Sequence, residues 1–269
     1  MEYGSGEQEE AKSDKRWSVG TDHQEIEWQY DAPGGLERAE KWLDGREGSG
    51  DPAKSGLAVF RGSSKELVDT YYDTEDWRLY RAGYALRIRR KTSGEDPEAT
   101  MKSFVSAGGT VGNLRKWREI SEPLKSDKLN ALSIAPGPVG VRLRTLIGSR
   151  EVRRIFEVRT RRQTFDLVLE EQQQLAEPEK VPTGGSTGVV RVGEVALDRS
   201  EIPLGAGTEP ARLVRVEVEV DASARTASPE LENFVKEMEG ALGLRPTMTS
   251  KYETGLFATG QGPERRSEP

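Results

Sequence analysis

Pairs of like-charged residues two positions apart are the feature of this sequence best suited to chemistry. The pairs are Glu25 and Glu27, Arg87 and Arg89, and Glu217 and Glu219. Side chains two apart on a strand share one face, so each pair would place a single sign of charge on one face of a strand. Crowded carboxylates repel each other unless a cation lies between them, and paired guanidiniums suit an anion. The pattern therefore predicts a metal-dependent polyphosphate site.

The composition limits the chemistry that such a site could use. The sequence has no cysteine, and its only histidine is His23, so thiolate nucleophiles, Cys-ligated zinc and histidine-based triads are excluded. An enzyme of this composition must rely on carboxylates, Lys, Arg, Tyr and hard metal ions. The formal net charge of -6 argues against a general nucleic-acid-binding protein, although a local basic pocket is compatible with it.

The two ends of the chain are polar and have few apolar residues. Residues 1–20 and 259–269 are therefore predicted to be disordered tails on either side of one domain at residues 21–258. No apolar run approaches the roughly 20 residues that span a bilayer, and the start of the sequence lacks the apolar segment of a signal peptide. A cytoplasmic protein with no membrane contact is expected.

The elements that would position the charged pairs are mostly strands, separated by Gly, Pro and Ser. Strands are expected at residues 23–30, 65–72, 84–91, 99–104, 114–121, 155–161, 164–170, 191–198 and 213–221. Helices are expected at residues 36–43, 127–134, 139–147 and 229–242, the last with Ser228 as N-cap and Pro229 in its first turn. Antiparallel strands with helices outside them predict a mainly β fold, either a barrel or a strongly curved sheet.

Two arrangements of these alternating strands are compatible with the sequence. In the first, apolar residues face inward and the charges are solvated, and periodicity alone favours this arrangement. In the second, charges line the lumen of a wide barrel and the apolar faces lie outside, under amphipathic helices. Two observations favour the second arrangement. The helices need apolar surfaces to cover, and opposed like charges on a solvated face would cost stability.

Five segments carry a resemblance to a known family. They are Glu-Ile-Glu-Trp-Gln-Tyr at 25–30, Tyr-Tyr-Asp-Thr at 71–74 with Arg-Ala-Gly at 81–83 and Ala-Leu-Arg-Ile-Arg at 85–89, Thr-Met-Lys at 100–102, Glu119 with Pro-Leu at 123–124, and Ser-Lys-Tyr-Glu-Thr-Gly-Leu at 250–256. In this order they resemble the CYTH superfamily, or triphosphate tunnel metalloenzymes, across nearly the whole ordered chain. That superfamily includes thiamine triphosphatases, inorganic triphosphatases, messenger-RNA capping triphosphatases and class IV adenylyl cyclases.

The resemblance implies an eight-stranded antiparallel β-barrel, with helices packed outside and a lumen that binds triphosphate. The implied phosphate contacts are Arg87, Arg89, Lys102, Arg162 and Lys251. The implied ligands of Mg²⁺ or Mn²⁺ are Glu25, Glu27, Glu217 and Glu219, with Glu119 and Asp198 as further candidates. Glu25, Glu27 and Lys251 would take part in catalysis. For Arg162, which ends the run Arg-Thr-Arg-Arg, a solvated arginine cluster is the alternative.

The implied chemistry is metal-assisted hydrolysis of a terminal phosphoryl group, with inorganic triphosphate as the favoured substrate. The expected ligand is a small triphosphate or polyphosphate, with neither nucleic acid nor membrane as partner. A homodimer is expected because dimers are common among soluble proteins.

Gln29 departs from the family pattern, because it stands where the family usually has Lys, and Ser121 stands where the family often has an acid. An amide carries no charge and cannot act as a base near neutral pH. A non-catalytic polyphosphate- or nucleotide-binding module is therefore the first alternative. A class IV adenylyl cyclase is the second, and no motif for a purine pocket accompanies it.

Overall fold

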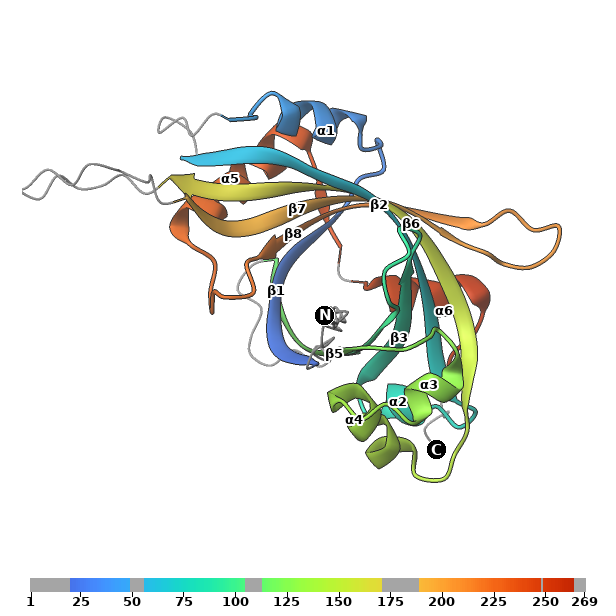
Figure 1. Cartoon of the computed structure of the whole chain (residues 1–269). Helices are drawn as coiled ribbons and strands as arrows, with labels where there is room; N and C mark the ends of the chain where they lie inside the picture. The colour runs from blue at the N-terminus through green and yellow to red at the C-terminus, as the bar shows by residue number, and fades with distance from the viewer. Residues whose placement is uncertain (1–19, 49–55, 105–112, 171–188, 248, 264–269) are drawn as a thin grey trace, which may run out of the picture.

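The computed structural model describes residues 20–48, 56–104, 113–170, 189–247 and 249–263. Within them, eight antiparallel strands form a closed ring (Figure 1). They are β1 (Thr21–Asp31), β2 (Leu57–Thr74), β3 (Tyr84–Lys91), β4 (Glu98–Ser103), β5 (Leu114–Pro123), β6 (Val152–Glu170), β7 (Val189–Ile202) and β8 (Ala211–Val220). Their order is β5-β4-β3-β2-β6-β7-β8-β1, and pairing of β1 with β5 closes the ring. The predicted eight-stranded antiparallel barrel is confirmed, and a two-residue strand, β9 (Arg245–Pro246), is added beside β1.

The two longest strands, β2 and β6, extend well beyond the predicted bounds. The predicted strands at 155–161 and 164–170 are one strand, β6, and β2 begins at Leu57 instead of residue 65. The two strands pair along their whole length. The register shifts between Arg61 and Ser64, where Gly62 and Ser63 form an irregularity in β2. A Cβ on Gly62 would lie 2.5 Å from the Thr164 hydroxyl oxygen. The glycine therefore allows a close approach inside a strand, in a part of the sequence where no strand was predicted.

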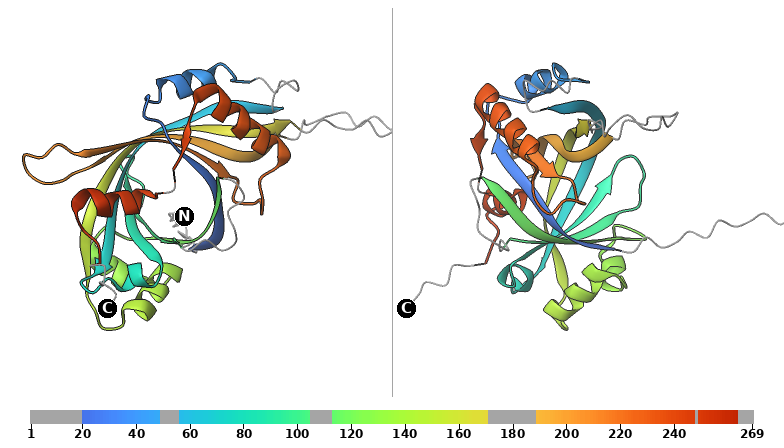
Figure 2. Two further views of the ribbon diagram at one scale, coloured as in Figure 1. Left: turned by 180° about the vertical axis from the view of Figure 1, so that it is seen from behind. Right: turned by 90° about the vertical axis from the view of Figure 1, so that its left-hand side faces the viewer.

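Helices lie on two opposite sides of the ring (Figure 1 and Figure 2). On one side are α1 (Glu37–Asp44) and α5 (Pro229–Leu242), and on the other are α2 (Arg78–Arg81), α3 (Leu129–Ser133) and α4 (Pro138–Ile147). The four predicted helices correspond to α1, α3, α4 and α5. Two further helices, α2 and α6 (Lys251–Thr259), were not predicted from the sequence. In α6, Ser250 and Glu253 form a capping box, a start signal that was present in the sequence.

The apolar residues between the charged ones pack outside the ring. Ile26, Trp28, Val216 and Val218 are buried in one cluster with Leu43 of α1 and with Leu231, Phe234 and Met238 of α5. Leu86, Ile88, Met101 and Ile120 are buried in a second cluster with Leu132 of α3 and with Val139, Leu143 and Ile147 of α4. The second arrangement considered for the strands, with apolar faces outside, is therefore correct.

A third cluster anchors α6 against the ring. Tyr71 and Phe156 stack with their ring centroids 4.8 Å apart, and Tyr252 of α6 stacks on Phe156 at 5.9 Å. A Cβ on Gly255 would lie 2.1 Å from the Phe156 ring, so only a glycine lets the helix come this close. This packing fixes the first turn of α6, which carries Lys251.

Most residues of the two predicted tails lie outside the part of the chain that the structure describes. Residues 1–19 and 264–269 lie outside the described residues. Thr259 ends α6, and just after it the Gln261 side-chain amide donates a hydrogen bond of 2.9 Å to the Ile155 carbonyl oxygen. Among the helices described, none has the length and apolar character needed to cross a membrane.

Candidate active site

The strand register brings the predicted site residues onto the inner face of the ring. Paired residues on neighbouring strands share a face, and Glu27 lies opposite both Glu219 and Arg115, while Lys102 lies opposite Glu119. A cavity of about 190 Å³ is lined by Glu25, Glu27, Arg87, Arg89, Lys102, Glu119, Arg162, Glu217, Glu219 and Lys251. Asp198, the remaining predicted residue, is fully buried against the side chains of Arg162 and Lys251.

The acidic cluster, Glu25, Glu27, Glu219 and Lys102, combines three carboxyl groups with one ammonium. Lys102 Nζ forms ion pairs with Glu25 and, at 2.9 Å, with Glu27 Oε1. Burial raises the pKa of Glu27, and Glu25 adds to this effect while Lys102 opposes it. Burial, with Glu25 and Glu27, raises the pKa of Glu219 to about 8. The cluster therefore holds more carboxyl groups than cationic side chains, and Glu219 keeps a proton up to about pH 8.

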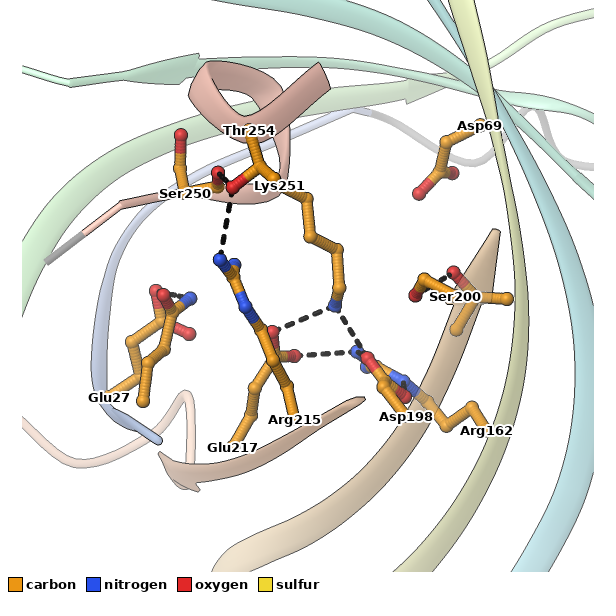
Figure 3. A network of polar contacts seen from close by, with 12 residues as sticks. Glu27, Asp69, Arg162, Asp198, Ser200, Arg215, Glu217, Ser250, Lys251 and Thr254 are labelled. Carbon is orange, nitrogen blue, oxygen red and sulfur yellow. Dashed lines mark hydrogen bonds and ion pairs between the residues drawn. The ribbon is translucent and has the colours of Figure 1, made fainter. Parts of the chain in front are cut away.

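The ion-pair cluster, Arg162, Lys251, Asp198 and Glu217, is balanced (Figure 3). Arg162 donates two hydrogen bonds to Asp198, at 2.8 and 2.6 Å, and one to Glu217 at 2.7 Å. Lys251 reaches in from α6 and donates to Asp198 at 2.5 Å and to Glu217 at 2.7 Å. Burial would raise the pKa of Glu217, but the charges of Lys251 and Arg162 outweigh it and hold this pKa well below its usual range.

The arginines of β3 share a carboxylate that the sequence analysis did not select. Arg89 donates to both oxygens of buried Asp69, at 2.7 and 2.8 Å, and Arg87 Nη1 lies 3.7 Å from the same carboxylate. Arg87 also approaches Glu119 at 3.9 Å, and within the described residues its buried Nε has no hydrogen-bond partner. Asp69 and Tyr71 are two residues apart on β2 and therefore share a face of the strand. Tyr71 lines the cavity, so the two-residue repeat of the strand could have indicated that Asp69 faces inward.

Gln29 lies beside the acidic cluster and is almost fully buried. Its Nε2 donates a hydrogen bond of 3.0 Å to Glu27 Oε1, and its Oε1 accepts one of 3.1 Å from Arg115 Nη1. Ser121, the other departure from the family pattern, forms a hydrogen bond of 2.8 Å with the Thr21 hydroxyl instead. Arg115 was not among the predicted site residues, because it belongs to no short sequence motif.

The acidic cluster fits a hard divalent ion by its donor chemistry. Mg²⁺ and Mn²⁺ prefer carboxylate oxygens, and the raised pKa of Glu219 shows that its ionised form lacks a stabilising cation. In the described part of the chain, no three acidic side chains are already arranged to hold a metal ion. Lys102 lies between Glu25 and Glu27. These carboxylates would therefore have to exchange an ammonium for the ion.

Comparison with known proteins gives a family and a fold. The sequence matches the family model of the CYTH domain over residues 54–252. No curated protein matches it. β1, with Glu25, Glu27 and Gln29, precedes the matched residues, so the strand register alone places these side chains in the site.

Two solved structures share the fold. A putative adenylyl cyclase from Hippeastrum, described as having a dominant triphosphatase activity, is 16% identical, with a TM-score of 0.52 over 88% of this chain and 96% of that chain. A putative adenylate cyclase from Bacillus halodurans is 21% identical, with a TM-score of 0.51 over 88% of this chain and 98% of that chain. The family model matches most of the sequence, and the matched residues include most of the ring and its charged lining. The protein therefore belongs to the CYTH domain family.

Proposed function

We propose that this protein removes the terminal phosphate from a triphosphate compound with the help of Mg²⁺ or Mn²⁺, and that inorganic triphosphate is the favoured substrate. The observation that carries the proposal is the cavity inside the ring. There, five cationic side chains, Arg87, Arg89, Lys102, Arg162 and Lys251, lie around a group of acidic side chains, one of which, Glu219, lacks a stabilising cation. Membership of the CYTH domain family supports the same function.

The cationic residues would bind the phosphate chain. Each of them is held by a carboxylate in the ligand-free protein, so binding would exchange carboxylate oxygens for phosphate oxygens. Arg87, Arg89 and Arg162 suit bidentate contacts because the guanidinium is planar, while Lys102 and Lys251 supply point charges. Lys251 would neutralise charge that develops on the transferred phosphoryl group.

Glu25, Glu27 and Glu219 would hold the metal ion, with Glu217, Glu119 and Asp198 as further candidates. When bound, such an ion polarises phosphate oxygens and lowers the pKa of a coordinated water molecule. Glu25 and Glu27 would orient the attacking water in line with the bond that breaks. Positioning and charge neutralisation suffice for this reaction, which suits a chain with no cysteine and one histidine.

A non-catalytic polyphosphate- or nucleotide-binding module is the second candidate, and Gln29 is the observation that favours it. Its amide supplies neither the charge nor the ammonium of a lysine beside Glu27. Both candidates would bind a polyphosphate compound, but only the triphosphatase would release phosphate from it.

Phosphate release separates the candidates. The purified protein is incubated with tripolyphosphate, ATP or thiamine triphosphate, each with Mn²⁺, Mg²⁺ or EDTA. We expect metal-dependent release from tripolyphosphate that EDTA abolishes. Tight binding without release would support the binding module, and cyclic AMP with pyrophosphate from ATP would indicate a cyclase. Arg161→Ala, which alters an arginine exposed at 81% beside Glu66, is the control that should leave release unchanged.

A further inference from the structure

The Gln29 amide connects two buried charged groups on neighbouring strands. On one side it donates to the Glu27 carboxylate of its own strand, β1, and on the other it accepts from the Arg115 guanidinium of β5. All three residues are buried, with exposed fractions of 7% for Gln29, 3% for Glu27 and 4% for Arg115. The result is a continuous chain of hydrogen bonds from Arg115 through Gln29 to a wall of the cavity.

The two neighbours of Gln29 impose opposite demands. A carboxylate accepts hydrogen bonds and a guanidinium only donates them, so the residue between them must offer a donor and an acceptor at once. An amide does this in one orientation, with nitrogen toward Glu27 and oxygen toward Arg115. A lysine at position 29 would satisfy Glu27, but it would place an ammonium against Arg115.

A second buried guanidinium strengthens this conflict. Arg215 is 1% exposed. Burial lowers the pKa of Arg115, and the charge of Arg215 adds to this effect while Glu27 opposes it. A lysine at position 29 would therefore add a third positive charge to a region that already holds two desolvated guanidiniums. The neutral amide avoids this repulsion.

We propose that Arg115 is a positioning residue that acts through the Gln29 amide to hold Glu27, so that the positive charge absent from position 29 is supplied from the neighbouring strand. Arg115 fixes the amide, and the amide fixes Glu27 Oε1, which also accepts from Lys102 at 2.9 Å. This inference rests on the proposed function for its consequence, because Glu27 is one of the residues proposed to hold the metal. The hydrogen-bond chain itself does not depend on that function.

The expected effect is on metal affinity and turnover. Without Arg115, the amide is free to turn its oxygen toward Glu27, which would repel the carboxylate instead of holding it. Removal of a residue that orients a metal ligand typically costs about 10- to 100-fold in affinity or activity. We therefore expect Arg115→Met to weaken Mn²⁺ binding about 10-fold and to lower kcat, with a smaller change in KM.

A double-mutant cycle tests whether the two residues act as a unit. Mn²⁺ affinity of the substrate-free protein is measured for Gln29→Met, Arg115→Met and the double variant. If Arg115 acts through Gln29, the second substitution adds little to the first. Effects on affinity that add fully would overturn the proposal, as would an Arg115→Met variant that is less stable but binds Mn²⁺ as tightly as the wild type. Arg115→Lys keeps a cationic donor and should recover part of the affinity.

A charge-relocation pair gives the sharpest contrast. Gln29→Lys alone should bring no gain in turnover, because the new ammonium meets Arg115. Gln29→Lys combined with Arg115→Met should be at least several-fold more active than Gln29→Lys alone. A large gain from Gln29→Lys alone would show that the amide limits the rate, which contradicts the proposal.

One measurement is independent of metal and activity. In the metal-free protein, the side-chain NH₂ protons of Gln29 should be protected from solvent exchange in NMR spectra and should lose that protection in Arg115→Met. Arg215→Met removes the other buried guanidinium, which bonds Thr249 and Thr254, and serves as the control that keeps the protection. Protection that is unchanged in Arg115→Met overturns the inference, even if the wild type proves to have no triphosphatase activity.

Discussion

The acidic cluster and the ion-pair cluster occupy the same cavity but hold their carboxylates in opposite states. Glu217 and Glu219 lie two residues apart on one face of β8. The pKa of Glu219 is raised to about 8 by burial and by Glu25 and Glu27, whereas Lys251 and Arg162 overcome burial and lower the pKa of Glu217. The neighbours, and not the residue type or the strand, determine the state of each carboxylate.

Under the proposed function, this difference suits the two clusters to different tasks. The acidic cluster has three carboxyl groups and one ammonium, which suits it to bind a metal cation. The ion-pair cluster has its charges balanced, which suits it to hold two cationic side chains in place until phosphate oxygens replace the carboxylates. Removing one carboxylate should therefore have opposite effects on stability in the two clusters.

The largest effect on stability is expected in the ion-pair cluster. Asp198→Asn removes the charge that faces both Arg162 and Lys251, and breaking a buried ion pair from one side costs on the order of 3 kcal/mol. Urea unfolding of the metal-free protein measures this free energy. Asp22→Asn, at an ion pair whose side chains are about half exposed, is the control that should change it little. An unchanged unfolding midpoint in Asp198→Asn would mean that the pairs contribute little.

The largest effect on turnover is expected in the acidic cluster. Glu27→Gln removes a carboxylate proposed to hold the metal ion, and we expect kcat with Mn²⁺ to fall at least about 100-fold. Glu66→Gln changes a carboxylate on the outside of β2, exposed at 58%, and should leave kcat unchanged. Equal kcat values for Glu27→Gln and the wild type would remove Glu27 from the site.

A smaller effect is expected on substrate binding. Arg87→Ala removes a guanidinium whose Nε has no hydrogen-bond partner among the described residues, and the loss of a hydrogen bond to a charged group costs about 1.5 to 3 kcal/mol. We therefore expect KM for tripolyphosphate to rise roughly 10- to 100-fold, with kcat changed less. Steady-state kinetics at saturating Mn²⁺ check this prediction. A fall in kcat alone would assign Arg87 to the transition state instead.

The last effect is a dependence of stability on pH. The pKa of Glu219 is raised to about 8 in the folded protein from an ordinary value of 4.5, so the folded state binds this proton more tightly than the unfolded chain does. The corresponding stability is present below pH 4.5 and is lost as the pH rises to about 8. Thermal unfolding should show that Glu219→Gln stabilises the metal-free protein at pH 8.5 and not at pH 4.

The Mn²⁺ affinity provides a second check on the same residue. Because the ion competes with the Glu219 proton, affinity should increase with pH up to about 8 in the wild type and less steeply in Glu219→Gln. Identical pH profiles for the two proteins would show that Glu219 does not hold the ion.

Local alternation in the sequence predicted most of the ring and its charged lining. In β1, β3 and β8, residues two apart necessarily share a face, so Glu25 with Glu27, or Arg87 with Arg89, could be placed together without any knowledge of partners. Periodicity alone could not say that this face points inward. The helices supplied that information, since the apolar faces of α4 and α5 needed a surface outside the ring to cover.

By itself, the sequence determined which charges share a strand face, because this follows from the two-residue repeat of every strand. Only the tertiary structure decided which charged side chains contact each other. Gln29 and Arg115 lie 86 positions apart in the sequence, and Lys251 reaches Asp198 from a helix that was not predicted. Such contacts depend on the register between distant strands and on how the ring closes. Burial increases the energy of these contacts, because desolvated charges in the lumen interact far more strongly than they would in water.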